Sequence, residues 1–75
     1  MHYLVVAEKA DTNYSAYAPD VPECVAMGDT VEETIERIRK ALQMHLEAII
    51  RDHESLPRPY SVLAVNVEAP EAAFV

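Results

Sequence analysis

The sequence predicts an α+β fold in which three short strands, one long helix and a final strand follow one another. Three observations support this prediction. Segments rich in β-branched and aromatic residues lie towards both ends, one long stretch has apolar residues at steps of three and four, and prolines punctuate the chain between them. The order is therefore β-β-β-α-β, with an antiparallel three-strand meander followed by a helix packed on the sheet. Residues 1–69 should form the domain and residues 70–75 a C-terminal tail.

The first two strands are predicted to form an antiparallel hairpin. Tyr3–Glu8 is short, contains β-branched and aromatic residues, and has apolar residues on both faces under period-two alternation. The turn residues Asp11–Asn13 follow, and Tyr14–Ala18 is the second strand. Apolar residues on both faces of the first strand indicate cover from two sides, by the helix and by another subunit.

A third strand is predicted just before the helix. Pro19–Pro22 should be an irregular connection, since its two prolines remove two hydrogen-bond donors from any interior strand. Cys24–Met27 is then a short strand. It ends at Gly28, the only glycine in the chain and the residue that adopts a positive φ at the lowest steric cost.

The helix is the clearest element of the sequence. Thr30–Glu33 fits a capping box, and no proline or glycine interrupts the chain from Val31 to Leu56. About 24 residues at 1.5 Å each give a rod of roughly 36 Å, so we expect its far end to overhang a small sheet and to cover a second copy of the chain. The expected oligomer interface consists of Leu46, Ile49, Ile50 and Phe74.

The prolines of Pro57–Pro59 end the helix and force an extended entry into the last strand, Tyr60–Glu68. Leu63, Val65 and Val67 occupy one face of that strand. With a single helix on one face of the sheet, the other face should be open to a partner.

Composition limits the function. The 75 residues include 13 acidic and six basic residues, for a net charge of −7, which disfavours general nucleic-acid binding and suits a basic protein partner. The chain is short yet 51% apolar, a combination that favours a homodimer or higher homo-oligomer. Neither a signal peptide nor an apolar stretch of membrane-spanning length is present, so we expect a cytoplasmic protein without membrane contact.

No catalytic constellation is evident. Cys24 lies beside an acid, which would raise its pKa and lower its reactivity, so it is interpreted as a structural cysteine. His45 and His53 are two helical turns apart, about 12 Å, which is too far for one metal ion. An alternative hypothesis is a residual magnesium-dependent nuclease, whose metal ions would be held by Asp11, Asp20 and Asp29. We expect no cofactor, no metal and no enzymatic activity.

The segment Tyr14–Glu33, YSAYAPDVPECVAMGDTVEE, resembles the HicB antitoxin family. The usual pattern there is a tyrosine-bearing strand, Pro-Asp-Leu-Pro-Gly-Cys, a short strand, Gly-Asp-Thr and a Glu-Glu helix start, and Pro57–Pro59 matches the Pro-x-Pro after the helix. The resemblance extends over residues 1–69. One departure is Glu23, where the family has glycine. A second is the short stretch after Pro70, from which we expect no operator-binding segment and no direct DNA binding.

The resemblance implies a degenerate RNase H-like fold and a partner, a small basic HicA-like toxin that cleaves mRNA. The antitoxin would neutralise this toxin by covering its active face. An orphan domain that only associates with itself is the remaining alternative to the antitoxin and the nuclease. For the toxin-binding surface we select the tyrosines and acidic residues around the family motif, which are Tyr14, Tyr17, Asp20, Glu23, Asp29, Glu32, Glu33 and Glu36.

Overall fold

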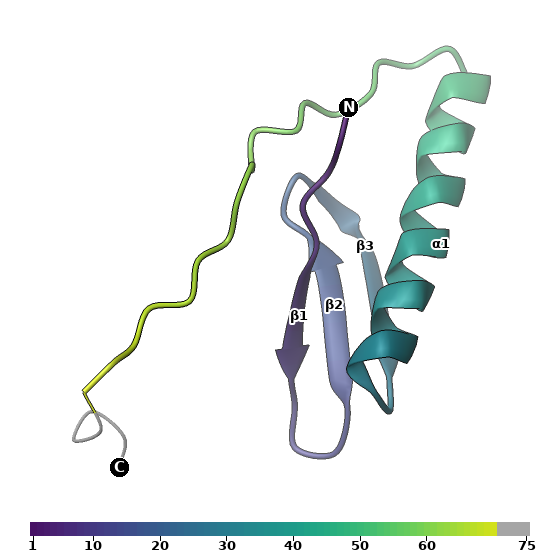
Figure 1. Ribbon diagram of the computed structural model, residues 1–75. Coiled ribbons are helices and arrows are strands. Elements are labelled where there is room, and N and C mark those ends of the chain that lie inside the picture. The colour runs from purple at the N-terminus through teal and green to yellow at the C-terminus, as the bar shows by residue number, and fades with distance from the viewer. Residues whose placement is uncertain (71–75) are drawn as a thin grey trace.

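The computed structural model describes residues 1–70 and contains a three-stranded antiparallel sheet with one long helix packed against it (Figure 1). The strands are β1 (Val6–Lys9), β2 (Tyr14–Ala18) and β3 (Val21–Gly28), and the helix is α1 (Val31–Arg51). The strands lie in the order β1-β2-β3, so β2 is central. The predicted α+β class and the meander are confirmed.

The first hairpin forms as predicted, with a shift of its first strand. β1 begins at Val6, three residues later than expected, and pairs with β2 from Val6 opposite Tyr17 to Lys9 opposite Tyr14. Tyr3 and Val5 precede the strand and pack on the edge of the core. They therefore contribute apolar surface, although they make no ladder hydrogen bonds in β1.

β3 is longer than predicted, because the segment expected to be an irregular connection is partly strand. Val21 pairs with Ala18, and the register shifts between Tyr17 and Ala18, where the ladder is irregular. Pro22 is exposed on this outer strand, so its missing N–H removes no interior ladder bond. Only Pro19 and Asp20 remain as the turn.

The core lies between the sheet and α1. Its buried apolar residues come from β2, β3 and the middle of the helix, and they are Ala16, Ala18, Val21, Cys24, Ile38 and Leu42. The two alanines are fully buried on β2. Because they have no more than a methyl group, the helix lies close to the central strand, and Ile38 fills the space between helix and sheet.

The helix ends at Arg51, before the predicted Leu56. The N–H groups of His53 and Glu54 donate to the carbonyls of Ile50 and Ile49, each at 3.0 Å, and His53 has a φ of 59°. These two bonds around a left-handed residue form a Schellman motif. The helix was predicted to continue until the prolines of Pro57–Pro59, and a histidine in the left-handed conformation ends it earlier.

The predicted last strand and the RNase H-like arrangement are not confirmed. Within residues 52–70 the chain forms no strand; Tyr60–Glu68, the C-terminal arm, runs away from the sheet (Figure 1). Its start is held, since Ser61 N–H and Oγ donate to the Asp20 carboxylate at 2.8 and 3.3 Å, and Tyr3 OH donates to the Pro57 carbonyl at 2.7 Å. An extended segment becomes a strand only where a neighbouring backbone accepts its hydrogen bonds, and the arm has no such neighbour among residues 1–70.

Candidate partner-binding surface

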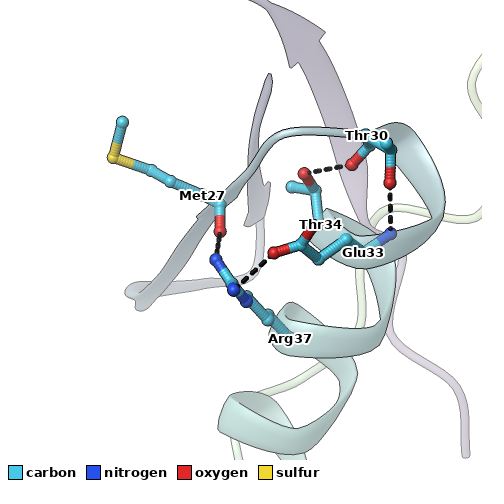
Figure 2. A network of polar contacts seen from close by, with 5 residues as sticks. All are labelled: Met27, Thr30, Glu33, Thr34 and Arg37. Carbon is cyan, nitrogen blue, oxygen red and sulfur yellow. Dashed lines mark hydrogen bonds and ion pairs between the residues drawn. The ribbon is translucent and has the colours of Figure 1, made fainter. Parts of the chain in front are cut away.

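A compact polar network joins β3 to the start of α1 (Figure 2). Thr30 Oγ1 accepts from the N–H of Glu33 at 3.1 Å, which confirms Thr30 as the helix N-cap. The fully buried Thr34 hydroxyl donates to the Thr30 carbonyl at 2.7 Å, so the buried oxygen is satisfied. The network holds the turn between strand and helix in one shape, and with it the exposed acids of that turn.

Gly28 serves this packing, and its role differs from the predicted one. Its φ is not positive. A Cβ atom at this position would lie 2.6 Å from Thr34 Oγ1 and 3.0 Å from the backbone nitrogen of Thr34. The glycine is therefore required by the close approach of the helix start, and not by the conformation of the turn.

Arg37 connects the helix to the strand on the exposed side of the same network. Its Nη1 donates to the Met27 carbonyl at 2.8 Å, and its guanidinium forms an ion pair with Glu33 (Figure 2). Glu36 is likewise flanked by cations, Arg39 at 3.5 Å and Lys40 at 3.8 Å. Glu33 and Glu36, selected from the sequence for the partner surface, thus have basic neighbours that reduce their local negative charge.

The structure separates the other selected residues. Asp20 is half-buried and accepts two hydrogen bonds from Ser61, so it holds the start of the C-terminal arm. Asp29 and Glu32 are exposed on the turn into α1, and the ion pairs found within residues 1–70 do not include them. We call this pair the acidic corner.

The face of the sheet opposite α1 carries apolar side chains that the sequence analysis did not select. Val25 and Met27 are 64% and 56% exposed. They alternate with the buried Cys24 and the half-buried Ala26, so they point away from the helix, as does Glu23. Tyr17 pairs with Val25 across the ladder and shares this face. Tyr17, Glu23, Val25 and Met27 are called the outer sheet face, and the period-two pattern of Cys24–Met27 was the signal that could have identified it.

The two selected tyrosines lie on different faces of the sheet. Tyr14 is three residues before Tyr17 on β2, so the two side chains lie on opposite faces of the sheet. Tyr14 shares the helix-facing side with Ala16, and only Tyr17 belongs to the outer sheet face.

Cys24 is buried on the helix-facing side, in agreement with a structural role. Burial, and secondarily the charge of Glu23, raise the pKa of its thiol. A raised pKa leaves less thiolate at neutral pH and makes the thiol a weaker nucleophile. Within residues 1–70 the structure brings no base into hydrogen-bond contact with it.

The carboxylates considered for a magnesium site do not converge. Asp20 and Asp29 lie beyond opposite ends of the eight-residue β3, a separation of roughly 25 Å at about 3.3 Å per residue. Asp11 lies in the turn between β1 and β2, at the same end as Asp29. Among the described residues no three histidine, cysteine or acidic side chains are placed to hold a metal ion.

The residues selected for an oligomer interface lie on the second half of α1 or beyond the described part. Leu46 and Ile49 are half-buried, and Ile50 is 58% exposed. Phe74 lies outside the residues that the structure describes. No helix within residues 1–70 is long and apolar enough to span a membrane.

Comparison with known proteins identifies a consistent set of relatives. The family described as "HicB_like antitoxin of bacterial toxin-antitoxin system" matches residues 3–74. An antitoxin named HicB 1 of Photorhabdus laumondii is 35% identical over 71 residues, 93% of this chain and 46% of that protein. A second antitoxin of the same organism, named HicB 2, is 31% identical over 70 residues, 93% of this chain and 50% of that protein.

Two further relatives have names that state no function. An uncharacterised 14.9 kDa protein of Haemophilus phage HP1 is 36% identical over 58 residues, 77% of this chain and 44% of the phage protein. A UPF0150 protein of Synechocystis is 36% identical over 58 residues, 76% of this chain and 73% of that protein. The chain thus spans about half the length of the phage protein and of the two antitoxins. No solved structure matches it significantly.

Proposed function

Because the chain belongs to the HicB-like antitoxin family, we propose that it is an antitoxin that binds and neutralises a small basic HicA-like toxin. Binding would cover the active face of the toxin and exclude its RNA substrate. The protein would act in the cytoplasm, where that RNA is, and by occlusion without catalysis.

The observations that support this proposal most directly are the outer sheet face and the acidic corner, which follows the end of β3. They combine Tyr17, Val25 and Met27, which supply apolar area, with Glu23 and the acidic corner, which supply negative charge. A protein that binds RNA presents positive charge to the phosphates. A negative surface competes for that charge and speeds association, while the apolar centre supplies the contact area that slows dissociation.

The acidic corner suits this role because the polar network holds it in place. Asp29 lies between Gly28, which packs against Thr34, and Thr30, which caps the helix. Glu32 lies in the first turn of α1. Charges held in place before binding cost less conformational entropy when a partner arrives.

The test is charge reversal on this surface with a matched control. We expect Glu23→Lys/Asp29→Lys to weaken binding to a purified HicA-like toxin at least tenfold, measured by titration calorimetry, and to abolish rescue of cells expressing that toxin. Glu47→Lys/Glu54→Lys makes the same charge change on exposed residues at the far end of the helix and beyond it, and should bind as the unmodified chain does.

Circular dichroism of each variant establishes that the fold is retained. Equal binding by both double variants would exclude this surface as the toxin contact. Failure of the unmodified chain to bind the toxin, together with no rescue of growth, would refute the antitoxin function itself.

A further inference from the structure

The core of the molecule is incomplete on the β1 side. The helix lies mainly over β3 and β2 and has little contact with β1. Between α1 and the segment leading into β1 is an open cavity of about 570 Å³. Its apolar lining comes from both elements and includes Tyr3, Val5, Ile35, Ile38, Leu42 and Leu46. We call this cavity the β1 groove; it lies where the inward face of a strand next to β1 would pack.

The backbone of β1 is also unpaired on that side. β1 is at the edge of the sheet, with β2 as its one neighbour within the described residues. An edge strand presents a row of free N–H and C=O groups, which is a template for another strand. The groove and the free edge therefore fit the same kind of segment, an extended one with apolar residues at alternate positions.

The C-terminal arm has these properties, and within the described part of the chain it pairs with no strand. Leu63, Val65 and Val67 alternate along it and are 75%, 71% and 85% exposed. Tyr60 and Val62 are 79% and 87% exposed. With the arm extended, the radius of gyration is 14.8 Å, against about 11 Å for a compact chain of 75 residues.

We propose that the arm of one copy adds as a fourth strand beside β1 of a second copy, with Leu63, Val65 and Val67 in the β1 groove. Two copies related by a two-fold axis exchange arms in this way, so both sheets are completed and neither arm is left exposed. The main interface between subunits would then be formed by the arm and the β1 groove, and not by the end of the helix.

The placement of the arm favours the second copy over the arm's own sheet. Its start is held by the Asp20 carboxylate at Ser61, and from there the chain diverges from β1 (Figure 1). The part beyond Val62 points out of the molecule. The arm beyond Val62 can therefore pair with a second subunit while the hydrogen bonds between Ser61 and Asp20 stay as they are.

The exposure and charge of the arm also indicate its partner. Leu63, Val65 and Val67 are the side chains that the β1 groove would cover, and each of them is more than two thirds exposed in the single chain. Glu68 is the only charged residue in the arm. The arm therefore has little charge to attract the basic surface of a toxin, and its apolar side chains suit an apolar groove.

The first test is the mass in solution of the unmodified chain and of two neighbouring variants. The chain should have twice its monomer mass of 8.4 kDa by light scattering. Val65→Asp places a charge on the side of the arm that enters the groove, and should reduce the mass to that of a monomer. Asn66→Asp adds the same charge one residue later on the opposite side, and should leave the dimer intact.

The second test locates the arm directly and does not depend on a variant that folds. In a mixture of labelled and unlabelled chains, isotope-filtered nuclear Overhauser spectra should show contacts between Val65 of one copy and Val5 of the other. A monomer, a dimer whose arm contacts lie within one chain, or a dimer without contact between arm and β1 groove would each overturn the proposal. Neither test involves a toxin, so failure here leaves the toxin-binding function to be judged on its own experiment.

Discussion

At the scale of single residues, two positions changed meaning when the fold was known. Gly28 looked like a turn glycine and is instead a contact point for Thr34, because a Cβ atom would lie 2.6 Å from the threonine hydroxyl oxygen. Asp20 was selected for a binding surface, and the structure gives it a second role, since it holds Ser61. Neither role has a local signature, since each depends on a residue that is distant in the sequence or on another element.

His53 gives the prediction that belongs to this scale. It has a φ of 59° at the end of α1, a conformation that costs a non-glycine residue about 1 kcal/mol. We expect His53→Gly to raise the free energy of unfolding by about 0.5–1 kcal/mol, measured by urea denaturation. His53→Ala retains the cost and serves as the control. An unchanged or lower stability of the glycine variant would show that the left-handed conformation is not what ends the helix.

At the scale of elements, the helix was the most predictable part of the protein and its end the least. Its start was predicted correctly at Val31, because an N-cap is a local interaction between residues three apart. Its end was predicted five residues too late, because the apolar stripe continues past Arg51 while the backbone leaves the helix at His53. β2 was predicted with the right limits, and β3 is longer than predicted, since it also includes Val21–Glu23 and Gly28.

Thr30 provides the test at this scale. Thr30→Ala removes the acceptor of the Glu33 N–H and leaves the helix start without its cap, so we expect a loss of about 1 kcal/mol in the free energy of unfolding. Thr30→Ser keeps the oxygen in place and should remain within a few tenths of the original value. Thermal denaturation followed by circular dichroism measures both. A serine variant as unstable as the alanine variant would contradict the capping role.

At the scale of the whole molecule, the sheet and helix form one core that is closed towards β3 and open towards β1. The residue pattern predicted a fourth strand at Tyr60–Glu68, and this segment pairs with no strand among residues 1–70. If another copy supplies the fourth strand, the exposed apolar arm and the open β1 groove are both explained. The high apolar fraction of a 75-residue chain has the same explanation, since a small domain gains from sharing its core.

A dimer held by exchanged arms has a consequence for stability. When dissociation accompanies unfolding, the midpoint temperature rises with protein concentration by mass action. We expect a measurable increase in Tm between about 5 and 500 μM for the unmodified chain, and none for Val65→Asp. Scanning calorimetry at several concentrations measures this. A Tm of the unmodified chain that is independent of concentration would argue against coupled folding and association.

The sequence by itself determined the elements whose signals are local. These are the hairpin, the capped helix start, the α+β class and, through the motifs of Tyr14–Glu33, the family. Period-two and three-to-four spacings, caps and prolines act between near neighbours, so they are visible in the chain.

The tertiary structure alone decided what Asp20 contacts, which face of the sheet is exposed and that the last apolar segment leaves its own sheet. Asp20 is held by Ser61, and Val25 and Met27 face away from α1. Each of these depends on contacts between elements or on which surface the helix covers. Local spacing does not predict these contacts, because they depend on which face of the sheet the helix covers and towards which edge it lies.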